Sequence, residues 1–299
     1  MLGIVWIVLL LQFATAPIST VAVDDAITFV HSARSMQPGE VILLEARSPQ
    51  PLRELQAKAF AREFVFFPGN GGLQWTGLIG IDLETKPGNY RLELSGIRTD
   101  GKAAIGGGTL SVKSRKFPER HLTVDEKYVS PPAEVLARIK QESKRVTGIF
   151  STTTPERIWQ GPFRLPVPGE VISAFGKRSI YNGKPRSPHA GVDFRGSTGT
   201  PVRAPNSGVV ALASNLYYSG NTVILDHGLG LYSYFGHMSS ISVQEGDRVE
   251  TGAIVGKVGA TGVVTGPHLH WTVRLSTSRI DPMSLVHVLG RLNNRPGEN

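Results

Sequence analysis

The chain has 299 residues, with 32 Lys and Arg against 24 Asp and Glu, and it contains no cysteine. A chain of this length is expected to fold as about two domains. With 40% hydrophobic and 19% charged residues, it resembles neither a multispanning membrane protein nor a disordered chain. The absence of cysteine excludes disulfides, a thiol nucleophile and Cys-ligated metal sites, so histidines and carboxylates must hold any metal.

The net charge of +8 fits three kinds of anionic partner: nucleic acid, a membrane surface or an acidic cell-wall polymer. The sequence has no run of Lys and Arg interleaved with aromatic residues. Nucleic acid is therefore not the expected partner.

Residues 1–23 carry no charged side chain, and residues 2–11 are almost continuously apolar. This length matches the apolar core of a signal peptide better than a spanning helix. Small residues precede the first acid at Asp24, so we expect cleavage near Ala22. Because the usual basic n-region is missing, an uncleaved N-terminal anchor is the alternative, and a buried helix or strand is a third. Both a signal peptide and an anchor would place the rest of the chain outside the cytoplasm, with the membrane contacted only through the anchor.

Residues 24–115 are predicted to form a β-sandwich, because turn signals such as Pro38-Gly39 and Asp100-Gly101 recur between short apolar segments. Tyr90, Leu92 and Leu94 alternate with polar residues, so they should share one face of a sheet. We expect the nearby aromatic residues to lie in the core: Phe64, Phe66, Phe67 and Trp75.

Residues 116–159 are predicted to be a linker with one helix. Ser130 and two prolines give a helix start, and Gly148 is expected to end the helix. An apolar stripe comprises Val135, Leu136, Ile139 and Val146, and the outward residues are Glu142, Lys144 and Arg145. Residues 151–155 are rich in Ser and Thr, so we expect a flexible connection there.

Residues 160–299 are predicted to form a second all-β domain, because glycine is dense and no long helical pattern intervenes. Strands are expected at 207–213, 222–225, 231–235, 253–258 and 269–275.

Histidines and one aspartate in this second domain make a candidate metal and acid–base site. His268 and His270 are two apart on a predicted strand, so they project from one face while Leu269 and Trp271 face the core. His189 and Asp193 can converge on one ion if the chain turns between them. Imidazole and carboxylate ligands without sulfur favour zinc or a neighbouring divalent ion.

The region from about 163 to 281 resembles the lysostaphin-like (LytM-type) zinc metallopeptidases, which cut peptidoglycan cross-bridges. The matching segments are His-Ala-Gly-Val-Asp at 189–193, Gly-Thr-Pro-Val at 199–202, Ala-Pro-Asn-Ser-Gly-Val-Val at 204–210, Gly-Asn-Thr-Val-Ile-Leu-Asp-His-Gly at 220–228 and Gly-Ala-Thr-Gly-Val-Val-Thr-Gly-Pro-His-Leu-His-Trp at 259–271. The N-terminal part is similar to the immunoglobulin-like domain that precedes such peptidases in some exported Gram-negative proteins.

This resemblance implies an antiparallel β-sheet peptidase domain of the duplicated hybrid motif type, exported to the periplasm or cell envelope. It implies Zn²⁺ held by His189, Asp193 and His270, with His237 and His268 as the catalytic residues and peptidoglycan stem peptides as the substrate. Phe235 and Met238 flank His237 where the family more often has Tyr and Leu, but both keep apolar bulk.

The family resemblance also places three residues along the substrate groove: Asn182, Tyr217 and Asn221. The remaining histidines have structural readings. His227 follows a predicted strand and is expected to be structural. The others are expected to be surface or core residues: His31, His121 and His287.

Three further hypotheses stay open. The chain could be a catalytically silent wall-binding regulator or activator of other wall hydrolases, since some relatives have lost metal ligands. The first domain, or a regulatory protein partner, could restrain the second domain. A lipoyl- or biotinyl-type carrier domain is disfavoured, because Lys257 lies within an apolar strand pattern and not at a hairpin tip.

Overall fold

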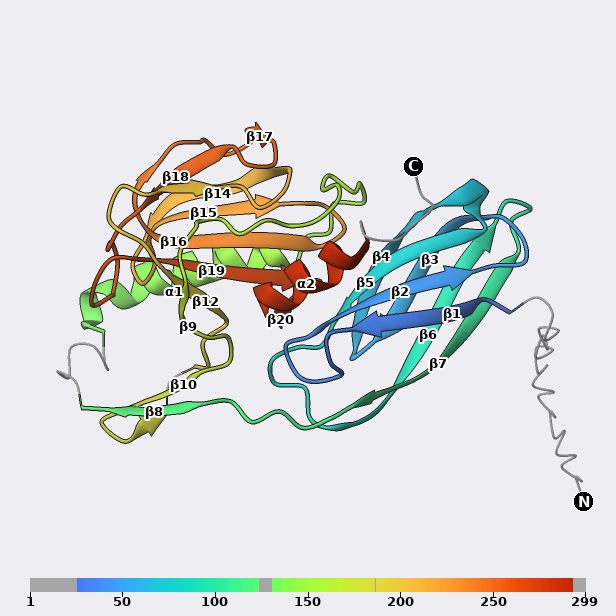
Figure 1. The fold of residues 1–299 in the computed structure, drawn as a ribbon, viewed down its shortest axis with the longest axis horizontal. Helices are drawn as coiled ribbons and strands as arrows, with labels where there is room; N and C mark the ends of the chain where they lie inside the picture. Colours follow the sequence, from blue (N-terminus) through green and yellow to red (C-terminus); the bar gives the residue numbers. More distant parts are fainter. Residues whose placement is uncertain (1–25, 124–130, 186, 293–299) are drawn as a thin grey trace, which may run out of the picture.

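The computed structural model describes residues 26–123, 131–185 and 187–292. These residues form two β-rich domains and the linker that joins them (Figure 1). The predicted signal peptide or anchor lies outside the described residues. Neither helix in the described ranges is long and apolar enough to cross a membrane.

The N-terminal domain is a sheet of seven antiparallel strands in the order β1-β2-β5-β4-β3-β6-β7. A short 3₁₀ turn, η2 (Asn70–Gly72), precedes β5. The strands are β1 (Thr28–Ala33), β2 (Val41–Arg47), β3 (Leu52–Ala59), β4 (Arg62–Pro68), β5 (Gln74–Gly80), β6 (Gly88–Arg98) and β7 (Ala103–Val112).

This sheet is continuous because β4 belongs to both of its halves. The first half of β4 pairs with β3, and the second half pairs with β5. A bridge between Ile27 and Gly106 brings the first and last strands together. The predicted all-β class is confirmed, but β4 joins what the sandwich prediction took as two separate sheets. The immunoglobulin-like character of this domain stays a prediction.

The core of the N-terminal domain follows the predicted pattern. Leu92 and Leu94 are buried, as the alternation along this strand requires. Three of the predicted core aromatics are buried as well: Phe64, Phe66 and Trp75. Phe67 is half-buried and contacts Trp159 of the following segment edge to face.

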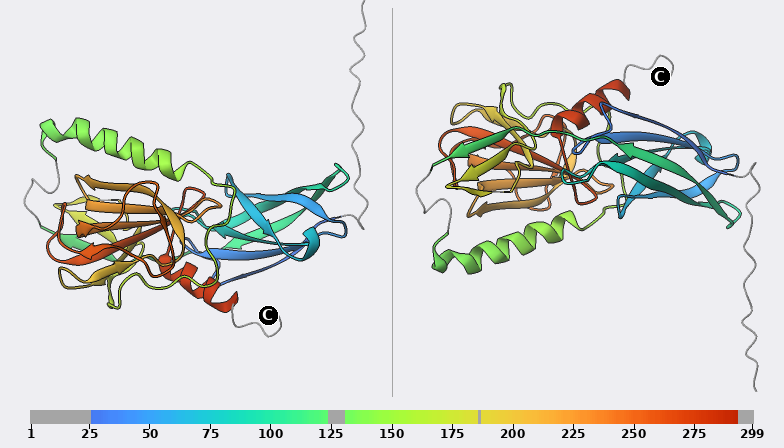
Figure 2. Two further views of the ribbon diagram at one scale, coloured as in Figure 1. Left: turned by 90° about the horizontal axis from the view of Figure 1, so that it is seen from above. Right: turned by 90° about the horizontal axis from the view of Figure 1, so that it is seen from below.

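The linker flanks the second domain on two sides. Strand β8 (Glu119–Leu122) pairs in parallel with β10 (Arg178–Tyr181). Helix α1 (Ala133–Phe150) lies along one side of the second domain, where Phe150 packs on Leu212 and Tyr232 (Figure 2).

Three expectations for the linker are wrong. Gly148 does not end α1, because burial of Ile149 and Phe150 against the sheet extends the helix. Glu142 does not face outward, since its carboxylate accepts a hydrogen bond from the Tyr217 N–H at 2.8 Å. The segment after α1 is tied down as well, because the Leu229 N–H donates to the Thr154 carbonyl at 2.7 Å.

The second domain is built on a ten-stranded sheet whose central strands run in the order β14-β15-β16-β19-β12. The predicted strands are all present, and most extend beyond the expected ends. The ten strands are β9 (Val171–Ser173), β12 (Gly191–Arg195), β13 (Pro201–Arg203), β14 (Gly208–Leu216), β15 (Gly220–Asp226), β16 (Leu231–Ile241), β17 (Arg248–Val249), β18 (Ile254–Val258), β19 (His268–Leu275) and β20 (Ser278–Ile280). Strand β11 (Lys184–Pro185) pairs with β10 in the small sheet that includes β8.

A second helix, α2 (Pro282–Leu292), was missed by the sequence prediction. The Asp281 carboxylate accepts the Met283 N–H at 3.0 Å, so Asp281 and Pro282 form an N-cap followed by proline at the first helical position. Leu285 and Leu289 are fully buried. The Asp-Pro pair was the available signal for this helix.

The two domains meet through buried ion pairs. The Arg34 guanidinium donates to Glu40 at 2.7 Å and to Asp281 of the second domain at 2.6 Å. Both carboxylates are almost fully buried, and Arg115 contacts both as well. A second contact joins Asp82 to Arg279 at 2.6 Å. Because a buried charge is costly when its partner is removed, these pairs fix the arrangement of the two domains.

We predict that His227 makes the fold sensitive to acid. The ring is fully buried between the Ser207 carbonyl at 2.7 Å and the Ser233 hydroxyl at 2.9 Å. Burial lowers the pKa of His227 to about 4. Below about pH 6.5 the unfolded chain binds a proton at this histidine, whereas the folded chain binds it only near pH 4. Lowering the pH over that range should therefore reduce the free energy of unfolding by roughly 2–3 kcal/mol.

Urea unfolding at pH 7.5 and 4.5 measures this effect. The pH-dependent loss of unfolding free energy should shrink in His227→Gln and remain unchanged in His287→Gln, since His287 is exposed. An equal loss in wild type and His227→Gln would contradict the prediction.

Candidate metal centre

Two neighbouring strands bring the predicted site together. Antiparallel pairing of β12 with β19 places Asp193 directly opposite His270. Leu269 and Trp271 are fully buried, so the flanking His268 and His270 project from the other face, as the alternation predicted. Gly191 lets the two strands approach, because a Cβ at this position would lie 2.4 Å from the Trp271 carbonyl oxygen.

Three ring and carboxylate atoms converge at this point. The Nε2 atom of His189 lies 3.0 Å from the Asp193 Oδ1 atom and 3.0 Å from the His270 Nδ1 atom. His270 Nδ1 lies 2.8 Å from the same Oδ1 atom. Among the described residues, these three side chains form the one cluster that could hold a metal ion.

The outer hydrogen bonds of both imidazoles leave only acceptors at the centre. His189 Nδ1 lies 3.0 Å from the Ala174 carbonyl, which can only accept, so this nitrogen carries the proton. His270 Nε2 lies 2.9 Å from the Thr272 hydroxyl, which can accept a proton from it. With the proton of His270 on Nε2, Nε2 of His189 and Nδ1 of His270 present lone pairs toward the Asp193 carboxylate.

The charge of the cluster suits a divalent cation. Burial favours the neutral form of His270 and lowers its pKa. Burial alone would raise the pKa of Asp193, but when the inner ring nitrogens carry protons, their hydrogen bonds to the carboxylate outweigh burial and hold that pKa well below its usual range. A metal ion would take the place of those protons. A tetrahedral ion with ligand bonds of about 2.0–2.2 Å keeps its donors roughly 3.3 Å apart, a few tenths of an ångström more than here, so the residues fit such an ion.

His237 and His268 lie beside the three converging atoms. Their ring centroids are 4.9 Å apart, and the His237 ring is 5.9 Å from that of His270. His268 Nδ1 donates to the Gly266 carbonyl at 2.9 Å, and His237 Nδ1 donates to the Thr261 carbonyl at 3.0 Å. Each ring thus keeps a free Nε2 lone pair. Burial lowers the pKa of His237 to about 4, so the ring is neutral at physiological pH.

The position of His237 depends on a break in strand β16. Phe235 is fully buried on the core face, and strict alternation would bury His237 beside it. His237 instead has a φ of 66°, which interrupts the pleat. Its N–H donates to the Ser219 carbonyl at 2.6 Å. This left-handed residue turns the ring toward His268 and His270, and no sequence pattern indicated the break.

Two of the predicted substrate residues, Asn182 and Tyr217, lie in loops, and Asn221 lies in strand β15. Asn182 lies in the tight turn between β10 and β11, with a φ of 50°. Tyr217 follows β14 and packs edge to face on Tyr218, 5.1 Å between ring centroids. The side-chain amide of Asn221 bonds to Asn215 and to the Ser239 carbonyl, which favours a structural role for this residue.

The other histidines are not part of the cluster. His227 is buried among Phe163, Ser207 and Ser233, in keeping with the structural role expected from sequence. The others are exposed: His31, His121 and His287.

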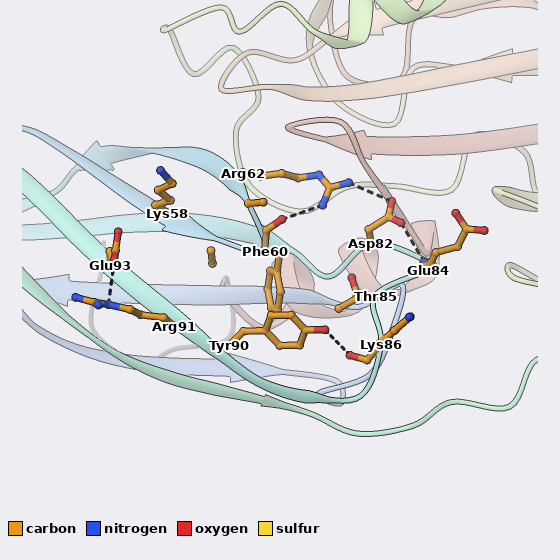
Figure 3. Close-up of a pocket in the computed structure, with 12 residues that line it drawn as sticks. Lys58, Phe60, Arg62, Asp82, Glu84, Thr85, Lys86, Tyr90, Arg91 and Glu93 are labelled. Atoms are coloured by element: carbon orange, nitrogen blue, oxygen red, sulfur yellow. Dashed lines mark hydrogen bonds and ion pairs between the residues drawn. The ribbon is translucent and has the colours of Figure 1, made fainter.

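The N-terminal domain carries a separate open pocket of about 650 Å³. Figure 3 shows the Phe60 and Tyr90 rings close together in this pocket, with Arg62 reaching toward Asp82. Its charged lining residues are of both signs, and no histidine is among them. This pocket therefore lacks the ligands of the metal centre.

Comparison with known proteins agrees with this geometry. The sequence profile of peptidase family M23 matches residues 187–282, which include all five clustered side chains. A crystal structure from Pseudomonas aeruginosa, assigned to M23 peptidases, is 31% identical and covers 85% of this chain and 96% of its own, with a TM-score of 0.67.

Two named relatives each match about a third of the chain. The peptidoglycan DD-endopeptidase ShyA of Vibrio cholerae is 40% identical over 111 residues, which are 36% of this chain and 26% of ShyA. The DD-carboxypeptidase/endopeptidase Mpg of Neisseria meningitidis is 38% identical over 98 residues, 33% of this chain and 23% of Mpg. The chain thus spans about a quarter of the length of these relatives. The profile match, and a structural relative that the chain covers almost completely, show that this protein belongs to peptidase family M23.

Proposed function

We propose that this protein is a zinc metalloendopeptidase that hydrolyses peptide cross-links of peptidoglycan. The observation that carries the proposal is the convergence of three lone-pair donors beside two further histidines with free Nε2 atoms. An M23 peptidase needs a metal site and proton-transfer groups in one place, and this cluster supplies both.

Zinc is the metal that these ligands favour. His189, Asp193 and His270 supply two imidazoles and one carboxylate, without sulfur. Three protein ligands are the usual number for a catalytic zinc, with a further position left for water. Zinc at this site would supply a Lewis acid for the peptide carbonyl and water activated near neutral pH.

His237 and His268 are the proposed proton carriers. Their Nε2 lone pairs accept the proton that the attacking water releases, and the same groups return it to the leaving amine when the C–N bond breaks. Once protonated, either ring can also stabilise the oxyanion that develops on the peptide carbonyl. The backbone carbonyls of Thr261 and Gly266 keep both rings in the required tautomer.

Peptidoglycan is proposed as the substrate because ShyA is named as a peptidoglycan DD-endopeptidase and Mpg as a DD-carboxypeptidase/endopeptidase. The loops that carry Asn182 and Tyr217 are the proposed sides of the groove for stem peptides. The net charge of +8 is consistent with work beside an anionic wall polymer. Export to the periplasm or cell envelope, through residues 1–23, is part of the same proposal.

A catalytically silent regulator of other wall hydrolases is the second candidate. It is less favoured because this chain keeps all five residues of the cluster. Full biological activity of a metal-free preparation would favour the regulator. Restraint of the peptidase by the first domain or by a partner protein stays a prediction.

The first test is digestion of purified cell-wall sacculi by the full chain loaded with zinc. Mass spectrometry should detect released muropeptides with wild type and with His287→Ala, which changes an exposed histidine. His270→Ala and His237→Ala should each reduce release by about a hundredfold or more. Equal release from all four proteins, or none from zinc-loaded wild type, would contradict the proposal.

The second test concerns the support of His270. Thr272→Val removes the hydroxyl that lies within hydrogen-bond distance of His270 Nε2 but keeps the side-chain shape. Loss of such an outer hydrogen bond should weaken zinc binding by about 10- to 100-fold. Thr222→Val is the matched control, because Thr222 is also buried and bonds to Ser219, not to a metal ligand. Competition with a chromogenic chelator measures both affinities, and an equal effect of the two variants would overturn the assignment.

A further inference from the structure

We propose that the junction between the two domains positions the metal ligand His189, so that the N-terminal domain supports the metal centre. This inference rests on the metal site of the proposed function. It assigns a positioning role to residues outside the peptidase sheet, chiefly Gly39, Phe117 and Phe175.

His189 depends on outside support because, unlike Asp193 and His270, it precedes its strand. Its three local hydrogen bonds all reach residues 174–177. The ring Nδ1–H donates to the Ala174 carbonyl at 3.0 Å, and the backbone N–H donates to the Lys177 carbonyl at 2.9 Å. The His189 carbonyl accepts the Gly176 N–H at 2.7 Å. The place of segment 174–177 therefore sets the place and tautomer of the ligand.

The same segment packs against the N-terminal domain. The Phe175 ring is almost fully buried and lies so close to Gly39 that a Cβ there would be 2.3 Å from a ring carbon. Gly39 is itself fixed from both domains, since its N–H donates to the Ile81 carbonyl at 2.8 Å and its carbonyl accepts the Asp281 N–H at 2.7 Å. The Phe175 ring thus packs directly against the backbone of Gly39.

The start of the linker holds the segment from a second side. The Phe117 ring lies so close to Gly176 that a Cβ there would be 2.0 Å away, and it packs edge to face on Phe175 at 6.2 Å. The Arg178 N–H donates to the Pro118 carbonyl at 2.8 Å, where β8 begins to pair with β10. Arg115 lies over the Phe117 ring at 4.9 Å.

Arg115 connects this aromatic packing to the buried ion pairs of the junction. Its guanidinium donates to the Pro38 carbonyl at 3.0 Å and to Glu40 at 3.2 Å. A cavity of about 440 Å³ borders Ala174, Phe175 and Arg115, so segment 174–177 is not packed on all sides. Its position therefore depends on the contacts with Gly39 and Phe117.

These contacts favour support over restraint. The junction contacts segment 174–177 beside His189, and the Ser278 hydroxyl donates to the Gly80 carbonyl at 3.2 Å, beyond the end of β19 that is remote from His268 and His270. Among the described residues, no hydrogen bond or ion pair links the N-terminal domain to the proton carriers His237 and His268. Weaker packing at the junction is therefore expected to lower the zinc affinity. If the N-terminal domain were inhibitory, weaker packing would instead raise the peptidase activity.

The test compares two phenylalanines of the junction in the full chain. Phe117→Ala removes the ring beside Gly176, whereas Phe67→Ala removes a ring that packs on Trp159, away from segment 174–177. Both variants should unfold at lower temperature than wild type. Only Phe117→Ala should weaken zinc binding, by about tenfold or more in chelator competition, and change the visible spectrum of bound Co²⁺. Phe117→Leu should restore most of the affinity.

Equal zinc affinity and identical Co²⁺ spectra in wild type and Phe117→Ala would overturn the inference. So would an equal loss of affinity in Phe67→Ala, because that loss would reflect general destabilisation. If Phe117→Ala does not fold, the comparison uses Gly39→Ala, whose Cβ would collide with the Phe175 ring, and Gly101→Ala, which has a similar left-handed φ but meets no atom within 4 Å. Failure of wild type to bind zinc at all would count against the proposed function, and it is distinguishable from a failure of this inference.

Discussion

Three lone pairs, on His189, His270 and Asp193, point at one another across 2.8–3.0 Å. Such a set of acceptors is stable only with a cation or protons between them. Burial disfavours the charged form of His270, and a metal ion satisfies all three atoms without protons on the inner ring nitrogens. The carbonyl of Ala174 fixes the tautomer of His189, and the hydroxyl of Thr272 can accept the proton of His270 Nε2, which leaves both inner nitrogens free for a ligand. The residues that hydrogen-bond to the outer nitrogens of His189 and His270 thus help to decide which atoms face the metal site.

Much of the fold serves to hold these atoms in register. Pairing of β12 with β19 supplies two of the ligands from adjacent strands, which makes their separation insensitive to loops. His189 lacks this advantage and lies between the sheet and the domain junction. The buried pair of Glu40 and Asp281, shared by Arg34 and Arg115, gives that junction the rigidity that a ligand position requires. The paired strands therefore position Asp193 and His270, whereas contacts at the domain junction position His189.

The sequence was informative where chemistry follows a strand period or a local turn. The spacing of His268 and His270 placed them on one face, and Gly191 indicated how His189 and Asp193 converge. Sequence could not place the His237 ring, because the φ of 66° there depends on Ser219 and Thr261 from other loops. It also could not pair Gly39 with Phe175, since that contact arises only when the two domains pack. The position of the His237 ring and the contact of Gly39 with Phe175 both depend on residues far apart in the sequence, so sequence patterns could not indicate them.

Of the five clustered side chains, three are proposed to bind one metal ion: His189, Asp193 and His270. Inductively coupled plasma mass spectrometry on the dialysed full chain measures the bound metal. We expect about one zinc per chain in wild type, His237→Ala and His268→Ala, and almost none in His270→Ala. Retention of zinc by His270→Ala, or its loss from His237→Ala and His268→Ala, would overturn this ligand assignment.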